Sequence, residues 1–522
     1  MLTLKESMEL AGQCHLAWLD PDKDWMPTGG YEVAHDAGRW WDAMLRLEAA
    51  TGFAIPAQLE EAMLRNLQRL MGNPDGLLVN DPGVDWMKDK AIINPHNLRE
   101  GMLSLAALVK YRGSDWAREA GHRLLLTIDR CLQPDGRLDF TRLNIWSRMP
   151  LTVDPCHDQP AGATWFDATA NTGRALEAIL AFYEAAGDPL AMSVADRIAR
   201  HHLANTVHPD GSPRLEILDP SNVGHNHSYL GTLRGLLLFG LLTRQREYVD
   251  AVNATYRRAL WRHHITESGW TPHDLGKTRF PNASGDPVAE TASCGDVVQL
   301  ALWLALRCGQ YDLLDDVERL VRSRLLPAQI TDDDLADPGN AGARLGPRQL
   351  GGWGVHGAPY GKGCILDVLA AVLHTLTDVY GQIASRDGIG LAVHLHFTYS
   401  SQEVELDSTR DRDACLVVKP KAAGPVAIRI PGWVPRDSLQ LSVDGEASLP
   451  KLIGPYVFVA PGESGPARVI ILRYPLPERV TTETFPGGRA YRLKWRGDEV
   501  VGVSPRETSL AAYPAFDASN SD

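Results

Sequence analysis

The spacing of apolar residues changes near residue 385, and this change constrains the fold more than any other feature of the chain. Before it, apolar residues recur every three or four positions in segments rich in Ala and Leu, which indicates helices. After it, short β-branched segments alternate apolar and polar residues between Gly, Pro and Asp turns, which indicates strands. Examples of predicted strands are 391–399, 414–419, 426–430 and 467–474. We therefore predict a helical part followed by a β part.

The helical part repeats a pair of helices joined by a short polar turn, as in 101–131 and 173–203. Second helices lead into Pro-Asp-Gly turns at 74–76, 134–136 and 209–211. Eleven or twelve helices paired in this way are what an (α/α)6 toroid requires. The fold class predicted is mainly α with a β domain. We expect an (α/α)6 barrel catalytic domain at 1–385, a C-terminal β-sandwich domain at 386–510 and a flexible tail at 511–522.

Charge and composition narrow the classes of partner. The chain has 52 Lys and Arg residues against 65 Asp and Glu residues, a net charge of −13, which disfavours binding to nucleic acid and to anionic membrane surfaces. No apolar run approaches the roughly 20 residues of a membrane span, and no signal peptide is visible. The seven sparse cysteines form no CxxC motif, as is typical of a reduced protein. We expect a cytoplasmic protein, either a monomer or a homodimer.

Polar side chains gather where successive predicted helices begin. Loops at one end of a toroid converge on a central pocket, so we expect these side chains to share one ligand rich in hydroxyl groups, a carbohydrate. Taken singly, each group is equally typical of a helix cap, a charged surface or a buried core residue. The predicted substrate-binding residues are Asp36, Trp40, His157, Asp167, His225, His227, His356 and Tyr360.

Two cysteines and a carboxylate belong to the same set of helix starts. Glu290 and Cys294 are four positions apart, so one helical turn would place them on the same side. Cys364 ends a Gly-rich loop before a long helix, where free N–H groups would lower the pKa of its thiol.

Several motifs resemble those of glycoside hydrolase family 127, the β-L-arabinofuranosidase-like group. Asp36 and Trp40 match its early Ser-Asp-x-x-Lys-Trp helix, and 429–433 matches its Arg-x-Pro-x-Trp strand. Glu290-Thr291 is similar to its Glu-Thr-Cys motif, and Gly363-Cys364 to its Cys-Cys-Pro-Pro-Asn motif. The resemblance runs from about residue 30 to about residue 475.

The resemblance implies an (α/α)6 barrel with β-sandwich material and an exo-acting retaining glycosidase. In that group a Cys thiolate is the nucleophile, a Glu is the acid/base, and one Glu and three Cys hold zinc. Glu290 matches the metal-binding Glu and Cys364 one of the paired Cys. This chain departs from the pattern at Gly363 and Ala292, where the group has Cys. Its acid motif is missing, and Asp274 lies about where the acid would be.

Two mechanisms stay open. Glu290, Cys294 and Cys364, with His356 as a further ligand, would form an altered zinc site with Cys364 as thiolate. Alternatively the metal is lost and paired carboxylates do the acid–base work, with candidates Asp36, Asp167, Asp274, Glu290 and Asp296. The predicted catalytic residues are Glu290, Cys364 and Asp274, and the predicted metal ligands are Glu290, Cys294 and Cys364.

The sequence thus predicts a glycoside hydrolase, with exo action on a small oligosaccharide or glycoside. Two other classes remain. A polysaccharide lyase on the same fold would use Tyr360 or a His as base. A non-catalytic sugar-binding relative would explain the altered Cys motif.

Overall fold

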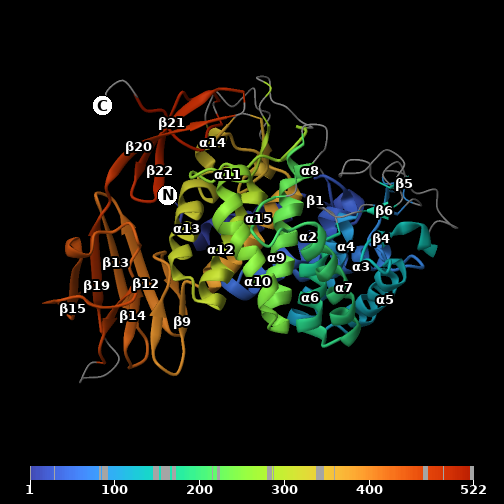
Figure 1. Cartoon of the computed structure of the whole chain (residues 1–522), viewed down its shortest axis with the longest axis horizontal. Helices are drawn as coiled ribbons and strands as arrows, with labels where there is room; N and C mark the ends of the chain where they lie inside the picture. Colours follow the sequence, from blue (N-terminus) through green and yellow to red (C-terminus); the bar gives the residue numbers. More distant parts are fainter. Residues whose placement is uncertain are drawn as a thin grey trace.

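The fold is described from a computed structural model of the whole chain. The description covers all residues except 1, 29, 82–83, 85–86, 88–91, 94, 145–151, 154–164, 167–171, 214, 220–223, 279–284, 286, 337–345, 358, 462–467, 486, 509 and 518–522. His157 and Asp167 therefore lie outside the described residues. Helices make up the first part of the chain and sheets the last part, as Figure 1 shows.

Among the described residues, six helices form an inner ring in which each packs on the next and the last packs on the first. They are α2 (Val33–Thr51), α4 (His96–Arg112), α6 (Ala175–Ala186), α9 (Asn226–Thr243), α12 (Thr291–Cys308) and α15 (Leu366–Gly381). Every residue from Asn226 to Gly240 and from Thr291 to Ala305 is buried, as expected for helices with neighbours on all sides.

In the part of the chain that the structure describes, six further helices pack outside this ring. They are α1 (Leu4–Ala17), α3 (Ala57–Leu70), α5 (Asp115–Cys131), α7 (Pro189–Asn205), α10 (Arg246–Thr255) and α13 (Leu314–Leu320). Helices α10 and α13 continue into π-helical turns at Tyr256–Leu260 and Val321–Leu325. Short helices α8 (Leu215–Leu218), α11 (Trp261–His263) and α14 (Asp332–Ala336) lie in the connections. The predicted (α/α)6 toroid is confirmed.

The three Pro-Asp-Gly turns have one structural role. Gly76, Gly136 and Gly211 have positive φ values of 65°, 87° and 83°. A Cβ on Gly136 would lie 2.7 Å from the backbone oxygen of Arg197, and one on Gly211 would lie 2.3 Å from that of Ala254. All three turns thus favour glycine for their backbone conformation, and Gly136 and Gly211 also need it for their close approach to an outer helix.

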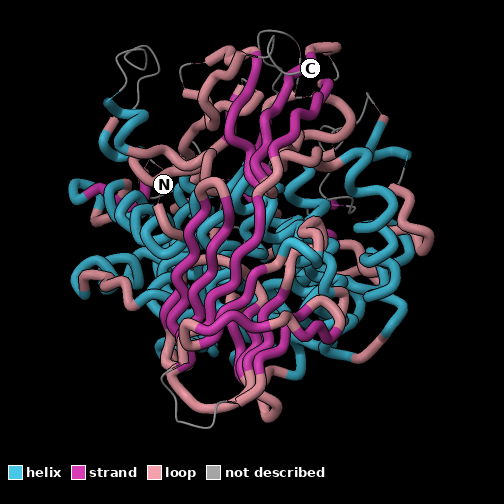
Figure 2. Tube along the Cα trace, turned by 90° about the vertical axis from the view of Figure 1, so that its left-hand side faces the viewer, coloured by secondary structure: helices cyan, strands magenta, loops and turns pink. Residues whose placement is uncertain are grey.

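The β part contains two larger sheets and one smaller sheet. The five-stranded sheet has the order β17 (Lys451–Ile453), β18 (Tyr456–Val459), β14 (Val426–Arg429), β10 (Leu391–Val393) and β9 (Ala384–Arg386). The six-stranded sheet has the order β11 (Tyr399–Ser400), β12 (Val404–Arg410), β13 (Asp413–Pro420), β19 (Ile470–Pro475), β15 (Gln440–Val443) and β16 (Glu446–Ser448). Figure 2 shows the sheets in front of the helices.

Strand pairing explains the shared core of these two sheets. All pairs within them are antiparallel except β10 with β14, which is parallel. Ile428 pairs with Val457 in one sheet and Leu416 with Leu472 in the other. All four side chains are buried in one hydrophobic core, because alternate residues of each strand face inward.

The end of the chain differs from the prediction. Strands β20 (Glu478–Thr484), β21 (Ala490–Arg496) and β22 (Glu499–Ser504) form a separate three-stranded sheet, which stands above the larger sheets in Figure 2. Part of 511–517, predicted as a flexible tail, is packed against the fold instead. The backbone N–H of Ala512 donates to the backbone oxygen of Tyr360 at 2.7 Å, and the side chain of Tyr513 is buried. The aromatic Tyr513 supplies apolar area that a fraying tail would leave in water.

One arginine fastens the β part to the toroid. Arg429 of β14 is buried and forms ion pairs with Asp315 and Glu318 of α13. Its Nε donates to the backbone oxygen of His394 at 2.6 Å. This is the Arg of the Arg-x-Pro-x-Trp segment, so that motif has a clear structural role here. No described helix combines the length and apolar character that crossing a bilayer requires.

Candidate functional site

The first two turns of the inner helices meet at one end of the toroid, which we call the mouth. Arg39 of α2 donates to the backbone oxygen of Asp367 in α15 at 2.6 Å, and its Nη2 lies 3.0 Å from His227 Nε2 of α9. Glu100 of α4 forms ion pairs with Arg39 and with Arg174, just before α6, each at 3.1 Å. Residues far apart in the chain are thereby joined at one place.

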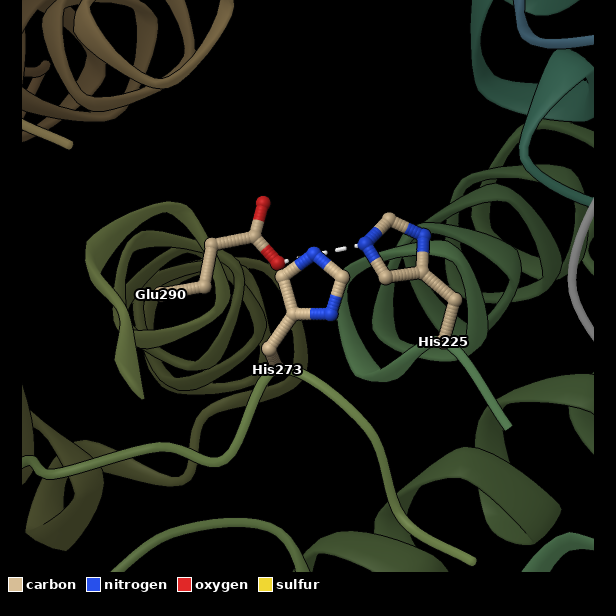
Figure 3. A group of neighbouring side chains, drawn as sticks. All are labelled: His225, His273 and Glu290. Carbon is tan, nitrogen blue, oxygen red and sulfur yellow. Dashed lines mark hydrogen bonds and ion pairs between the residues drawn. The ribbon is translucent and has the colours of Figure 1, made fainter. Parts of the chain in front are cut away.

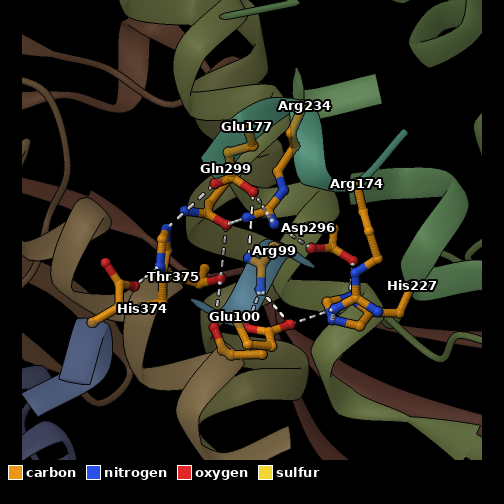
Figure 4. Close-up of polar contacts among 12 residues, drawn as sticks. Arg99, Glu100, Arg174, Glu177, His227, Arg234, Asp296, Gln299, His374 and Thr375 are labelled. Carbon is orange, nitrogen blue, oxygen red and sulfur yellow. Dashed lines mark hydrogen bonds and ion pairs between the residues drawn. The ribbon is translucent and has the colours of Figure 1, made fainter. Parts of the chain in front are cut away.

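A buried network of charges continues from the mouth into the toroid (Figure 4). His227 Nδ1 lies 2.5 Å from Asp296 Oδ2, and Asp296 Oδ1 lies 3.3 Å from Arg234. Glu177 Oε2 accepts from Arg234 at 2.8 Å and from Arg99 at 3.3 Å. Although burial raises the pKa of Glu177, Arg234 and Arg99 outweigh it and hold that pKa at about 2. The network is a fixed ionic scaffold, because removing one charge would leave its partner buried and unpaired.

This network also occupies His227. Its Nδ1 contacts Asp296, and its Nε2 contacts Arg39 and Arg174 at 3.0 and 3.2 Å. Burial, together with Arg174, holds the pKa of His227 well below its usual value of 6.5, so the ring is neutral. His227 was predicted to bind substrate, but both of its ring nitrogens are engaged by protein groups.

Three side chains at the mouth form a separate group in which ligand atoms converge. One nitrogen of His225, one nitrogen of His273 and one carboxylate oxygen of Glu290 all lie within 4.8 Å of one another. His225 Nε2 is 3.2 Å from Glu290 Oε2. Figure 3 shows both imidazole rings turning a nitrogen toward the Glu290 carboxylate. In the described part of the chain, this is the group of three or more His, Cys, Asp or Glu side chains that could hold a metal ion.

Neighbouring groups hold the two imidazoles in place. His273 Nδ1 lies 2.9 Å from Asp274 Oδ1, and a carboxylate can only accept, so His273 donates from Nδ1. His225 Nδ1 lies 2.8 Å from Ser228 Oγ. In both rings the outer nitrogen, Nε2, is therefore the one directed at Glu290.

Short stretches of paired backbone bring these residues together. His225 and Asp274 form an isolated β-bridge, and the backbone N–H of Asn226 donates to the backbone oxygen of His273 at 2.9 Å. On the α12 side, the backbone N–H of Glu290 donates to the backbone oxygen of Thr271 at 3.2 Å. The segment 271–275 is thus held between the starts of α9 and α12, which fixes the separation of the three side chains.

Asp36 is another carboxyl group at the mouth with an unusual environment. It lies in the first turn of α2 and is buried, and neither of its carboxylate oxygens has a hydrogen-bond partner of good geometry in the described part of the chain. Burial, with the nearby Asp367 and Glu32, raises the pKa of Asp36 well above its usual 3.8. A buried carboxyl group beside other acids keeps its proton more readily than an exposed one.

Two predicted sugar-binding aromatic residues lie elsewhere. Trp40 is buried in the main hydrophobic core, edge-on to Trp41 with ring centroids 5.0 Å apart. Tyr360 is buried among aromatic side chains of the three-stranded sheet, and its hydroxyl donates to Glu483 of β20. Burial, together with Glu483, holds the pKa of Tyr360 well above 10. Both predictions are corrected: these rings serve packing, because their flat faces are covered by protein.

The predicted Cys-containing metal site is not assembled. Cys364 Sγ lies 4.0 Å from Cys14 Sγ in α1, and the hydrogen bond with Cys14, with burial, holds the pKa of Cys364 well above 9. Cys294 is fully buried, and burial raises its pKa to about 12. Glu290, Cys294 and Cys364 do not come within ligand distance of one another. The helix start was expected to lower the pKa of Cys364 and favour its thiolate. The contact with the Cys14 thiol of α1 raises that pKa instead and has the larger effect.

His356 is near the mouth but is engaged otherwise. It lies in β8 (Val355–His356), which pairs with β7 (Ala289–Glu290) next to the start of α12. Its Nε2 accepts from Arg324 at 2.8 Å, and burial, with Arg324, holds its pKa well below 6.5.

The remaining short strands of the described chain lie in the loops of the toroid. They are β1 (Leu19–Asp20), β2 (Met26–Pro27), β3 (Ile92–Ile93), β4 (Leu138–Asp139), β5 (Thr152–Val153) and β6 (Trp165–Phe166).

The sequence interpretation missed two kinds of residue at the mouth. His273 begins no helix, so a search of helix starts overlooks it, although a His-Asp pair after a proline was a usable signal. Glu100 and Arg174 lie within or next to apolar helices, where charged residues that are buried need partners. Such charges in an otherwise apolar helix could have identified the ionic network.

Solved structures of other proteins share this fold. A GH127 β-L-arabinofuranosidase from Geobacillus stearothermophilus T6 superimposes with a TM-score of 0.56 at 15% identity, covering 94% of this chain and 80% of that one. A second GH127 β-arabinofuranosidase gives 0.59 at 15% identity, covering 95% and 81%, and a further glycoside hydrolase gives 0.58 at 12%, covering 96% and 81%.

The resemblance inferred from the sequence motifs is thereby confirmed at the level of the fold. No protein-family model matches the chain, and no curated protein matches it either.

Proposed function

We propose that this protein is a glycoside hydrolase that removes one sugar from the end of a short oligosaccharide or glycoside. The observation that carries the proposal is the meeting of His225, His273 and Glu290 at the mouth, with Asp274 behind His273. Arg39 connects this group to Asp36, because its charge acts on both Glu290 and Asp36. The fold is shared with enzymes named as GH127 arabinofuranosidases and as a glycoside hydrolase, which supports the same class of reaction. Helix starts that close around one end of a toroid favour short substrates over long polymers.

The reaction needs a proton donor for the leaving oxygen, and two carboxyl groups meet that need. Asp36 and Glu290 are both buried, and burial raises the pKa of each. A carboxyl group that keeps its proton near neutral pH can protonate a glycosidic oxygen, while a second carboxylate attacks the sugar or activates water. We take Asp36 and Glu290 as the two candidates for the donor, and Asp274 as a neighbouring carboxylate.

A thiolate mechanism has less support. The raised pKa of Cys364 and its contact with Cys14 favour the neutral thiol. Gly363 also stands where the resemblance would require a second Cys. The proposed chemistry therefore rests on carboxyl groups, and Cys364→Ser is expected to keep activity within about threefold, since neutral side chains away from the reaction contribute little.

The direct test is hydrolysis of a panel of aryl glycosides by the wild type and by two variants. Asp36→Asn and Glu290→Gln should each lower kcat/KM by about 10²–10⁴-fold on substrates with poor leaving groups, the usual effect of losing an acid or base. The variant that lacks the proton donor should recover on substrates with acidic phenol leaving groups, because these depart without protonation. The other variant should not recover.

Asp42→Asn is the matched control. It makes the same substitution further along α2, at a buried carboxylate that pairs with Arg46 and His374 rather than facing the mouth. It should lower Tm while leaving kcat/KM of the folded protein nearly unchanged. The proposal fails if both mouth variants retain full activity. It also fails if the products carry the ultraviolet absorbance of an unsaturated uronate, which would indicate a lyase, or if calorimetry detects sugar binding without turnover on any glycoside.

A further inference from the structure

The group formed by His225, His273 and Glu290 has a use that the proposed acid–base chemistry does not require. Two imidazole nitrogens and one carboxylate oxygen are the donor atoms of many three-ligand zinc sites. Zinc with ligands at about 2.1 Å holds its donor atoms roughly 3.4 Å apart in a tetrahedral arrangement. The distance from His225 Nε2 to Glu290 Oε2 is 3.2 Å, and all three donor atoms lie within 4.8 Å of one another. Small side-chain shifts would complete the geometry.

The groups behind the ligands match those of a metal site. Asp274 Oδ1 accepts a hydrogen bond from His273 Nδ1 at 2.9 Å, so Nε2 is the nitrogen of this ring that is turned toward Glu290 (Figure 3). Ser228 Oγ contacts His225 Nδ1 at 2.8 Å and so sets the second ring in the corresponding orientation. A carboxylate behind a histidine makes the imidazole a stronger ligand and fixes its orientation.

The local charges are mixed but permit a cation. The N-terminal ends of α9 and α12 are nearby, and each disfavours a cation by a factor of about 2–5. Arg39 and Arg174 are also near, but each is paired with Glu100. The carboxylates of Glu290 and Asp274 counter the helix ends, and direct coordination outweighs them by several orders of magnitude.

We propose that His225, His273 and Glu290 bind one divalent transition-metal ion, with zinc preferred over iron(II) and manganese(II), and that Asp274 positions His273. Imidazole with one carboxylate suits zinc, which such donor sets bind more tightly than iron(II) or manganese(II). The site differs from a Cys-ligated one, since it uses neither Cys294 nor Cys364. A zinc ion held by three protein ligands acts as a Lewis acid when bound. With Glu290 as a ligand, Asp36 is left as the proton donor.

Metal binding is tested by itself, without reference to turnover. The full-length protein is stripped with a chelator and titrated with zinc sulfate, and bound zinc is measured by mass spectrometry. We expect one zinc per chain and a higher Tm. His225→Gln and His273→Gln should each weaken zinc binding by at least about 100-fold, and Asp274→Asn by about 10–100-fold.

Two controls separate this site from nonspecific effects. His122→Gln removes a histidine of α5 that makes a similar contact with a carboxylate, Asp188 at 2.7 Å, far from the mouth in the fold. Cys364→Ser removes the thiol of the Cys-ligated alternative. Both variants should bind zinc as the wild type does.

A cobalt(II) spectrum of the wild type avoids the question of whether a variant folds. The proposal predicts visible ligand-field bands without a thiolate-to-cobalt charge-transfer band, because only N and O atoms coordinate. It is overturned if the wild type binds no zinc at micromolar concentration, if zinc binding survives in both His variants, or if the charge-transfer band is present. The inference shares Glu290 with the proposed function, yet a protein that binds zinc and hydrolyses no glycoside would support the site while refuting the reaction.

Discussion

Buried histidines are the side chains through which acid should act on this protein. His15 of α1 is almost completely buried, and burial lowers its pKa from 6.5 to about 3. His264 is buried in the same way, with a pKa lowered to about 3. In the unfolded chain these rings take up a proton below about pH 6.5, whereas in the folded protein they do not until about pH 3. Stability is therefore present above pH 6.5 and is lost as the pH falls toward 3.

Replacing His15 should reduce this acid sensitivity. Between pH 7 and pH 5 one such histidine costs about 2 kcal/mol of unfolding free energy, so His15→Leu should lose about that much less than the wild type over the same interval. The measurement is urea unfolding followed by circular dichroism at both pH values. His208→Leu, an exposed turn residue, is the control and should follow the wild type. Equal pH slopes for His15→Leu and the wild type would contradict the assignment.

At this scale the sequence could identify residues but not all of their neighbours. His225 and Glu290 were recognised because each stands at a helix start, and the structure places them 3.2 Å apart. Cys364 was recognised in the same way, but its environment is set by Cys14, 350 residues earlier in the chain. The pKa of a thiol depends on such contacts, which local spacing does not contain.

Helices were predicted well because their signal is local. The predicted helix pair at 101–131 corresponds to α4 (His96–Arg112) and α5 (Asp115–Cys131), and the pair at 173–203 to α6 (Ala175–Ala186) and α7 (Pro189–Asn205). The signal is weaker where a buried face is polar. The first turn of α12 is polar in sequence although it is buried in the fold. The buried face of α1 includes Ser7, Gly12 and His15, which interrupt the apolar spacing.

The turn at Gly211 gives a test at the scale of an element. Gly211→Ala would place a methyl group 2.3 Å from the Ala254 oxygen in a backbone with φ of 83°, so we expect a loss of about 3 kcal/mol of stability. Gly187→Ala is the matched control, because Gly187 also has a positive φ, of 70°, but has open space around its Cβ position. It should cost only about 1 kcal/mol.

Thermal unfolding of the two variants and the wild type distinguishes close approach from backbone strain. A larger decrease in Tm for Gly211→Ala than for Gly187→Ala is the expected order. Equal decreases in Tm would mean that the close approach of Gly211 to α10 does not require glycine. The recurring Pro-Asp-Gly motif would then reflect the backbone conformation of the turn alone.

At the scale of the molecule, the toroid followed by sheets could be predicted, whereas the layout of the sheets could not. Strands β20 to β22 alternate like those of the larger sheets, so nothing in their spacing indicates a separate sheet. Their place is set by contacts with the toroid: Glu483 of β20 accepts from the N–H and hydroxyl of Ser268, each at 2.8 Å. Such contacts across 215 residues decide the arrangement only after both parts have formed.

The whole molecule also offers a rival place for a sugar. A groove of about 380 Å³ lies where the five-stranded sheet meets the toroid, and Tyr311, His394 and Tyr456 are among the residues that line it. Aromatic and polar side chains in a groove suit carbohydrate as well, so the position of bound sugar discriminates between the two places.

The most direct test of the account is a crystal structure of the Glu290→Gln variant soaked with a glycoside that the wild type hydrolyses. We expect electron density for the sugar at the mouth, in contact with His225 and with its scissile oxygen close to Asp36. A sugar bound only in the groove beside Tyr311 and Tyr456, with the mouth empty, would contradict the central claim that the inner-helix starts form the reactive site.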